Sequence, residues 1–382
     1  MKILHLIDVV KPNTVPWLYS LILSIKKEKN LLSGWNYYGQ TAGIKTLVFP
    51  VSELEGGSFV VKIVNFFIRK WRGWSYLFFI KNNAKDIDLI HAHFAHVGWW
   101  NLSLKDSLNV PFIVSFYGYD YESIPHQYPK WNNRYQTLFK RADIFLAEGA
   151  FGADKLIKMG CNPSKVKIQR LGVDVKNVPF CKRTKAFGEL NLVQIAAVRE
   201  KKGQAYTLEA FLLVLKDFPT MTLTFVGEDN YGEIQNKISK LPIEQRSQIK
   251  YLDRIDFSKI YEFLSGFQVF IHPSCYAVNK DCEGGAPIVL LDAQATGLPV
   301  ISTFHCDIPE EVIHLKTGLL SEEKNVDQLA ESIRRFAEMK QDSYNDYSVE
   351  ARKHIEDNYD INKKGEELVR IYNNLITEVN FS

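Results

Sequence analysis

The chain has 382 residues, of which 46% are hydrophobic and 24% are charged. This composition is that of an ordinary globular protein, with enough chain for two domains of roughly 150 residues each, and it excludes a disordered polypeptide. The 47 basic and 44 acidic side chains leave a formal net charge of +3, which argues against a surface devoted to nucleic acid, so no nucleic-acid partner is expected.

The five cysteines are spread along the chain without a C-x-x-C pair. This pattern argues against a disulfide framework or a zinc knuckle and favours a reducing compartment. The first ten residues lack the long apolar run and cleavage site of a signal peptide, and no stretch of about 20 residues is free of charge. We therefore expect a cytoplasmic protein without a membrane-spanning helix.

Short apolar runs alternate with helix-length amphipathic runs from one end of the chain to the other. In the first half, this alternation predicts strands at 2–7, 88–92, 112–116 and 143–147, and helices near 15–29, 59–81, 98–109 and 131–140. In the second half, it predicts strands at 191–196, 222–227, 268–272 and 299–302, and helices near 204–217, 257–265, 287–296 and 325–340. Apolar strands separated by helices are typical of parallel sheets covered on both faces. We expect two doubly wound α/β domains that face each other across a cleft.

The series of strands and helices begins afresh after about residue 178, which predicts a domain boundary there. We interpret the polar, irregular stretch over residues 175–189 as the interdomain linker. Near the C-terminus, apolar side chains at spacings of three and four predict one stripe on a helix; they are Leu368, Ile371, Tyr372, Leu375, Ile376 and Val379. This terminal helix either packs on its own domain or crosses back onto the first.

The loops that follow strands are the candidates for function, because ligands of doubly wound sheets bind beyond the carboxyl ends of the strands. After the strand at 268–272 come Glu283, Gly284 and Gly285, ahead of a predicted helix. Bare glycines at a helix N-terminus offer free N–H groups that suit a phosphate. Asp292, in an otherwise apolar helix, needs a partner, which sugar hydroxyls would supply. The alternative is a simple turn, with Asp292 exposed or salt-bridged.

The first strand-to-helix turn of the second half carries Arg199, Lys201 and Lys202, just before Gly203. A diphosphate would lie at this turn, and the cations would neutralise it as a leaving group without a metal ion. The alternative is that these charges are simply solvated.

In the first half, HAHF (residues 91–94) and SFYGYD (residues 115–120) follow predicted strands. We expect no metal at His91, His93 and His96, because no cysteine or acidic ligand is adjacent to them.

These blocks together resemble glycosyltransferase family 4, whose members have the GT-B fold. The matching blocks, in chain order, are HAHF, FYGYD, RLGVD, REKKG, FVG and DCEGGAPIVLLDAQATGLPVIST. The likeness covers nearly the whole chain and is greatest to bacterial enzymes of exopolysaccharide, colanic-acid-like or O-antigen synthesis. It implies an N-terminal acceptor-binding domain over 1–178, a C-terminal nucleotide-sugar-binding domain over 179–360, and a helix over 361–382 that packs back on the first domain.

The resemblance also implies a role for each matching residue. Glu283 would contact the transferred sugar, and Asp292 would hold the ribose, although the spacing is E-x8-D where the family has E-x7-E. Arg199 and Lys202 would form the cationic clamp on the diphosphate. Gly203, Gly284 and Gly285 would complete the donor site. Tyr117 stands where the family has a histidine near the reacting centre, and Asp120, which follows it, would be a further donor-binding residue.

The implied reaction is a retaining transfer from a nucleoside-diphosphate sugar to a hydroxyl of a glycan acceptor. The acceptor would attack on the face that the diphosphate leaves, and neither a metal nor another cofactor is expected. Two alternatives remain: a nucleotide-sugar epimerase or hydrolase on the same fold, and a catalytically silent nucleotide-sugar-binding subunit.

Residues 59–80 form a segment in which cations and tryptophans interrupt an apolar run without any acidic residue; the cations are Lys62, Arg69, Lys70 and Arg72. The pattern suits a basic amphipathic segment on an anionic bilayer. A lipid-linked acceptor would then reach a peripheral enzyme on the inner face of the plasma membrane. The pattern equally suits a core helix whose cations face water.

Overall fold

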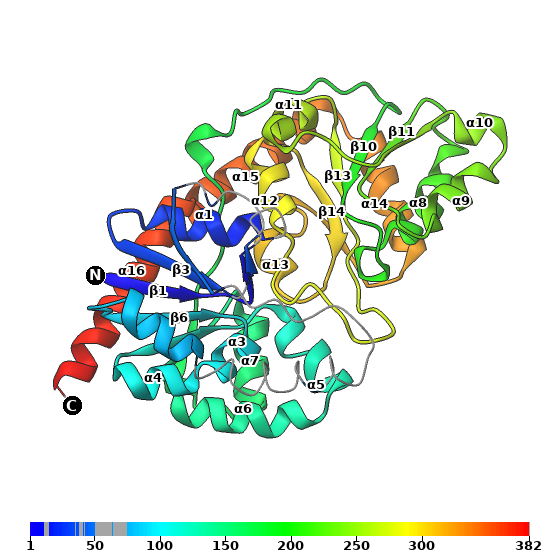
Figure 1. Cartoon of the computed structure of the whole chain (residues 1–382). Helices are drawn as coiled ribbons and strands as arrows, with labels where there is room; N and C mark the ends of the chain where they lie inside the picture. The colour runs from blue at the N-terminus through cyan, green and yellow to red at the C-terminus, as the bar shows by residue number, and fades with distance from the viewer. Residues whose placement is uncertain are drawn as a thin grey trace. The chain divides into compact units, whose positions relative to one another are not determined.

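In a computed structural model, the chain folds into two compact units, each built around a parallel sheet (Figure 1). The first unit comprises Met1–Leu171 and Asn362–Ser382, and the second comprises Gly172–Ile361. The structure describes residues 1–10, 15–34, 36–37, 41, 43–49, 63 and 75–381. The expected doubly wound α/β architecture is confirmed.

The first unit contains a seven-stranded sheet in the order β5-β3-β1-β6-β7-β8-β9. Its strands, all paired in parallel, are β5 (Lys45–Val48), β3 (Lys29–Gly34), β1 (Lys2–Leu6), β6 (Leu89–His93), β7 (Phe112–Ser115), β8 (Ile144–Ala147) and β9 (Val166–Ile168). A short pair, β2 (Val9–Val10) and β4 (Asn36–Tyr37), stands beside it. The direction of winding reverses between β1 and β6, which makes this point a topological switch point.

Helices cover both faces of this sheet. The larger core lies under α3 (Ala95–Trp100), α4 (Leu102–Leu108), α6 (Lys130–Arg141) and α7 (Ala150–Lys158), with α5 (Ser123–Gln127) beside them. The other face packs on α1 (Pro16–Ser24) and α16 (Ile361–Phe381). In α16, Leu368, Tyr372 and Leu375 of the predicted stripe are buried. The C-terminal helix therefore lies with the first unit, beside β1 and β6 (Figure 1).

The second unit contains a six-stranded parallel sheet in the order β12-β11-β10-β13-β14-β15. Its strands are β12 (Ile249–Leu252), β11 (Thr222–Val226), β10 (Asn191–Ile195), β13 (Val269–Ile271), β14 (Val300–Thr303) and β15 (Gly318–Ser321). One face packs on α8 (Gln204–Leu215) and α14 (Val326–Glu338), and the other on α11 (Ile260–Leu264), α12 (Ile288–Ala295) and α13 (Ile308–Glu311). Two short helices, α9 (Glu233–Ser239) and α10 (Ile243–Arg246), follow β11, and α15 (Gln341–Asn358) lies against α12.

The segment over residues 175–189 belongs to the second unit, so its interpretation as a linker is wrong. Two of its cations are buried against the carboxyl ends of helices. Arg183 donates to the carbonyl of Thr296, at the end of α12, over 2.9 Å. Lys185 donates over 2.7 Å to the carbonyl of Ala337, in the last turn of α14. Cations are stabilised there because the last carbonyls of a helix lack partners within it.

All eight predicted strands are present, with bounds shifted by at most one or two residues. The predicted helix at 98–109 is broken at Asn101 into α3 and α4. Of the helix predicted at 59–81, the structure describes residue 63 and residues 75–81, which are helical. Among the described residues, no helix has both the length and the apolarity to cross a bilayer.

Candidate active site

The winding of the second sheet reverses between β10 and β13, so the loops after these strands meet at the switch point, where ligands of such sheets bind. The backbones of the two loops abut. Cys275 N–H donates to the carbonyl of Lys201 over 2.9 Å. Gly203 has φ +71°, and a Cβ there would lie 2.1 Å from the carbonyl oxygen of Pro273. Both the positive φ and the close approach require glycine at this position.

Lys202 and Glu283 join the two loops through their side chains. Lys202 Nζ donates to Glu283 Oε2 over 2.7 Å, and Ser274 Oγ donates to Glu283 Oε1 over 2.8 Å. The side chain of Glu283 is only 6% exposed. Burial alone would raise the pKa of Glu283, but the charge of Lys202, the contact with His272 and the charge of Lys201 hold it well below its usual value. Glu283 is therefore an ionised carboxylate inside a cationic setting.

His272 lies beneath this pair and was not predicted as a site residue. Its ring is fully buried, and Nε2 stands 3.6 Å from Glu283 Oε1. Within the described part of the chain, neither ring nitrogen makes a hydrogen bond. Burial lowers the pKa of His272. Burial therefore favours a neutral imidazole beside the carboxylate.

The second lysine of the turn makes a parallel connection. Lys201 Nζ donates to Asp281 Oδ1 over 3.1 Å and to the carbonyl of Cys282 over 2.8 Å. Arg199 is exposed, and its guanidinium makes no hydrogen bond or ion pair among the described residues. The structure therefore brings Lys202 and Glu283 together and leaves Arg199 with a free guanidinium at the rim of the same turn.

Gly284 and Gly285 are buried between Glu283 and helix α12. The carbonyl of Gly285 accepts from Asp307 N–H over 3.2 Å. The helix begins at Ile288, directly after Pro287. That the N–H groups of both glycines bind a phosphate stays a prediction.

Asp292 lies in the second turn of α12 and is 7% exposed. Tyr261 OH donates to its Oδ1 over 3.0 Å. Burial raises the pKa of Asp292 to about 6, against the opposing effect of the Tyr261 hydrogen bond. Asp292 is thus neither exposed nor salt-bridged within the described residues, and Tyr261, from α11, is the partner that sequence spacing did not reveal.

In the first unit, Asp120 ties together the loops after β6 and β7. Its side chain is buried; Oδ1 accepts from Ala95 N–H over 3.0 Å, and Oδ2 accepts from Tyr117 N–H over 2.9 Å. Both carboxylate oxygens are therefore used by the backbone, so Asp120 shapes the loop that carries Tyr117.

Tyr117 ends a buried chain of hydrogen bonds that begins at Asn30. Asn30 Oδ1 lies 3.2 Å from His5 Nε2, His5 Nδ1 lies 3.0 Å from His93 Nε2, and His93 Nδ1 lies 2.9 Å from Tyr117 OH. Burial lowers the pKa of His5 to about 4 and that of His93 well below its usual value. Since Asn30 Oδ1 only accepts, both neutral rings must donate toward it, and Tyr117 OH donates to His93.

His5, His91 and His93 are close enough to suggest a metal site, but each of their nitrogens already has a protein partner. His91 lies 2.6 Å from Tyr372 OH and 2.7 Å from Ser115 Oγ. A carboxylate pair with one residue between, Asp86 and Asp88, precedes β6 at the amino edge of the sheet, where Asp88 accepts from Lys2 N–H. Neither group is arranged to hold a metal on a diphosphate.

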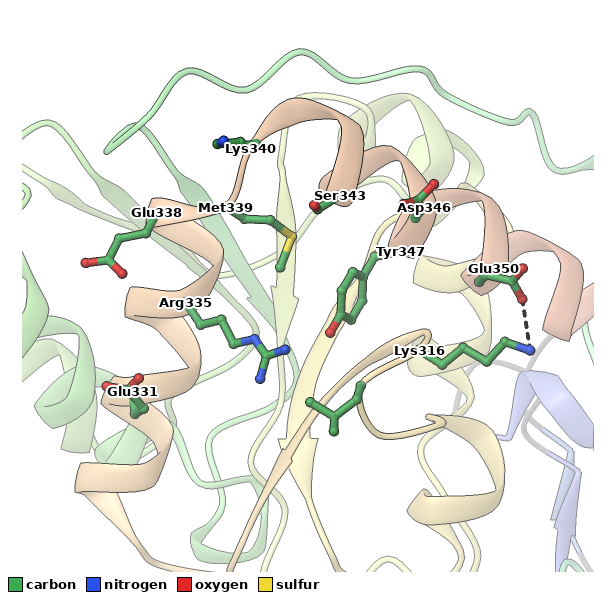
Figure 2. Close-up of a pocket in the computed structure, with 11 residues that line it drawn as sticks. Lys316, Glu331, Arg335, Glu338, Met339, Lys340, Ser343, Asp346, Tyr347 and Glu350 are labelled. Atoms are coloured by element: carbon green, nitrogen blue, oxygen red, sulfur yellow. Dashed lines mark ion pairs between the residues drawn. The ribbon is translucent and has the colours of Figure 1, made fainter.

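A pocket of about 620 Å³ lies between α14 and α15, with the Lys316–Glu350 ion pair at its margin (Figure 2). Leu315 and Lys316, which line it, directly precede β15. The pocket therefore lies at the amino edge of the sheet, opposite the loops that bind ligands in such folds. It is lined by none of the predicted site residues.

Two doubly wound units, each with a parallel sheet, are the architecture of the GT-B class of folds, to which the structural neighbours belong. The "OtsA apo structure" matches this chain with a TM-score of 0.77 at 12% identity, over 97% of this chain and 99% of that one. Anabaena HepE, solved in complex with UDP, matches with a TM-score of 0.74 at 14% identity, over 98% and 100% of the two chains.

Sequence comparison gives the family. Residues 182–354 match the family "Glycosyl transferases group 1", and residues 48–177 match "Glycosyltransferase Family 4". The chain belongs to the glycosyltransferases. It is 30% identical over 277 residues to the putative colanic acid biosynthesis glycosyltransferase WcaL of Salmonella typhimurium, covering 70% of this chain and 66% of the relative. It is 28% identical over 258 residues to the amylovoran biosynthesis glycosyltransferase AmsK of Erwinia amylovora, covering 67% and 62%. The matches thus span about two thirds of the length of these curated relatives.

Proposed function

We propose that the chain is a retaining glycosyltransferase that moves a sugar from a nucleoside-diphosphate sugar to a hydroxyl of a glycan acceptor in surface polysaccharide synthesis. The observation that carries this proposal is the Lys202–Glu283 pair at the switch point of the second unit. The names of WcaL and AmsK support the pathway, and the UDP complex of HepE supports the donor class.

The cations of the turn after β10 stabilise the leaving diphosphate. Lys202 exchanges part of its contact with Glu283 for a phosphate oxygen, and the free guanidinium of Arg199 closes over the other oxygens. A fixed donor aimed at charge that grows in the transition state contributes about 3–4 kcal/mol. Two such cations balance the charge of the diphosphate, so the reaction uses no metal and no other cofactor.

Glu283 accepts hydrogen bonds from hydroxyls of the transferred sugar. Its carboxylate remains ionised near neutral pH, because Lys202 and Lys201 lower its pKa. Gly203 keeps the two loops in contact, and Gly284 and Gly285 let the backbone approach the donor closely. The acceptor hydroxyl attacks the anomeric carbon on the face that the diphosphate leaves, and the leaving phosphate oxygen takes the proton of that hydroxyl.

Asp292 holds the ribose of the donor. Its Oδ1 is used by Tyr261, and ribose hydroxyls donating to the remaining lone pairs would offset the cost of a buried charge. A bound nucleoside therefore lowers the pKa of Asp292 toward its usual value. In the first unit, the oxygen of Tyr117 accepts a hydrogen bond from the acceptor, and Asp120 positions it.

We further propose a lipid-linked acceptor and a cytoplasmic enzyme that lies on the inner face of the plasma membrane. The support is the basic amphipathic pattern over 59–80, whose cations fall outside the described residues. Flotation with anionic liposomes at physiological salt tests this point. Failure to float would refute the membrane contact and leave the transfer reaction standing.

Incubation with a panel of nucleoside-diphosphate sugars, with and without lipid-linked glycan acceptors, tests the reaction. The expected product is a glycan extended by one sugar, with the anomeric configuration of the donor retained in its NMR spectrum. Conversion or cleavage of the donor without an acceptor would indicate an epimerase or hydrolase. Donor binding without turnover across the panel would indicate a silent binding subunit.

A further inference from the structure

Two cysteines and a histidine converge behind Glu283. Cys282 directly precedes Glu283 in the loop after β13, and His305 and Cys306 follow β14. The two sulfur atoms and a ring nitrogen of His305 all lie within 4.8 Å of one another. Cys282 and His305 are buried, and Cys306 is half-buried. The proposed sugar transfer uses none of these three side chains.

The distances in this cluster fit a tetrahedral metal ion. Cys306 Sγ lies 3.3 Å from His305 Nε2. With bonds of about 2.3 Å to sulfur and 2.0–2.1 Å to nitrogen, a tetrahedral zinc ion would hold these two atoms about 3.5 Å apart. Cys306 also has a φ of 47°, a strained conformation for a residue with a Cβ, and such strain is concentrated at functional sites.

The ring of His305 is already oriented as that of a metal ligand. Its Nδ1 lies 2.7 Å from Glu323 Oε1, so the ring proton sits on Nδ1. The lone pair of Nε2 accepts from Glu283 N–H over 3.3 Å, and the same nitrogen lies 3.3 Å from Cys306 Sγ. A carboxylate behind a ligating histidine is the usual device that fixes tautomer and orientation.

The charges in the cluster balance. Two thiolates and a neutral imidazole neutralise a divalent ion, so the occupied site buries no net charge. Glu283 N–H donates to His305 Nε2 over a long 3.3 Å. When the ion occupies this nitrogen, the N–H is close enough to turn toward a bound thiolate.

We propose that Cys282, His305 and Cys306 bind one zinc ion, whose fourth position is open to water. Binding forms two metal–sulfur bonds and one metal–nitrogen bond, and the two thiol protons are released to solvent without any oxidation. The ion clamps the loop before Glu283 to the loop after β14, and it takes no part in neutralising the diphosphate. The proposal stands whether or not sugar transfer is found.

Titration of the full chain with Co²⁺ as the probe tests this site, with Zn²⁺ competition and measured metal content as independent readouts. We expect one equivalent of Co²⁺ to give a near-ultraviolet sulfur-to-cobalt charge-transfer band and the intense visible bands of tetrahedral cobalt. One equivalent of Zn²⁺ should abolish both. Bound zinc should also protect two thiols from a thiol reagent in the folded protein.

Cys306→Ser and Cys282→Ser should each lose the charge-transfer band, while Cys161→Ser, which removes a buried thiol of the first unit, should keep it. Near-ultraviolet circular dichroism shows whether each variant is folded. The band persisting in both folded site variants would overturn the proposal. Wild-type protein that binds no cobalt would also overturn the proposal. So would a wild-type mass, measured without reductant, that is two hydrogens below the mass of the sequence, because a disulfide would then have consumed the two thiols. If both site variants fail to fold, absence of zinc protection of the wild-type thiols is the overturning result.

Discussion

The buried carboxyl of Asp292 makes the stability of the protein depend on pH. Burial raises its pKa from 3.8 to about 6. At about 1.4 kcal/mol per pH unit, this difference corresponds to about 3 kcal/mol. Between about pH 4 and pH 6, the folded chain holds a proton that the unfolded chain has released, so the free energy of unfolding falls as pH rises through that window. Above it, the folded protein carries the full cost of the buried charge.

Asp292→Asn removes this titration while leaving an oxygen to accept from Tyr261. Relative to the wild type, the free energy of unfolding of the variant should increase by up to about 3 kcal/mol between pH 4 and pH 8. Urea unfolding at a series of pH values measures the change. Asp256→Asn is the matched control, because Asp256 is exposed and its pKa is lowered by hydrogen bonds from Ser258. A gap between Asp292→Asn and wild type that does not vary with pH would refute the reasoning.

Four further substitutions are expected to give distinct results. Arg199→Ala should lower the turnover number by about 10²–10³ without changing the melting temperature; unchanged turnover would remove Arg199 from the clamp. Glu283→Gln should lower turnover while UDP affinity is kept, as titration calorimetry would show. Gly203→Ala should lower the melting temperature, because its Cβ would meet the Pro273 carbonyl; an unchanged melt would contradict this contact. Tyr117→Phe leaves a buried nitrogen without a donor and should cost about 1–3 kcal/mol in urea unfolding; a neutral variant would contradict the hydrogen-bonded chain.

The strand–helix alternation was predictable because most central strands are apolar throughout. The pattern does not predict β3 (Lys29–Gly34) or β15 (Gly318–Ser321), because polar residues and a glycine leave β3 only two apolar residues, and β15 is short and begins at a glycine. The sequence predicts a linker over 175–189, because its cations resemble those of a solvated surface. Only the fold shows that Arg183 and Lys185 are buried on the last carbonyls of helices.

At the candidate site, sequence identified the charged pair and missed what surrounds it. Lys202 and Glu283 follow adjacent strands, so the rule for carboxyl ends of parallel strands brings them together. His272 and Tyr261 were missed because only packing places them beside Glu283 and Asp292. The chain from Asn30 to Tyr117 was equally hidden, since it joins residues of four strands or loops that are distant in sequence.

Titration calorimetry of UDP into wild type, Lys202→Ala and Lys237→Ala tests most directly whether the turn after β10 binds the diphosphate. Lys237 is the matched control, because it pairs with Glu209 on the same unit, away from the switch point. A charge-assisted hydrogen bond contributes about 1.5–3 kcal/mol, so Lys202→Ala should weaken binding of UDP about 10- to 100-fold, with Lys237→Ala unchanged. Equal dissociation constants for wild type and Lys202→Ala would contradict the donor site proposed for this protein.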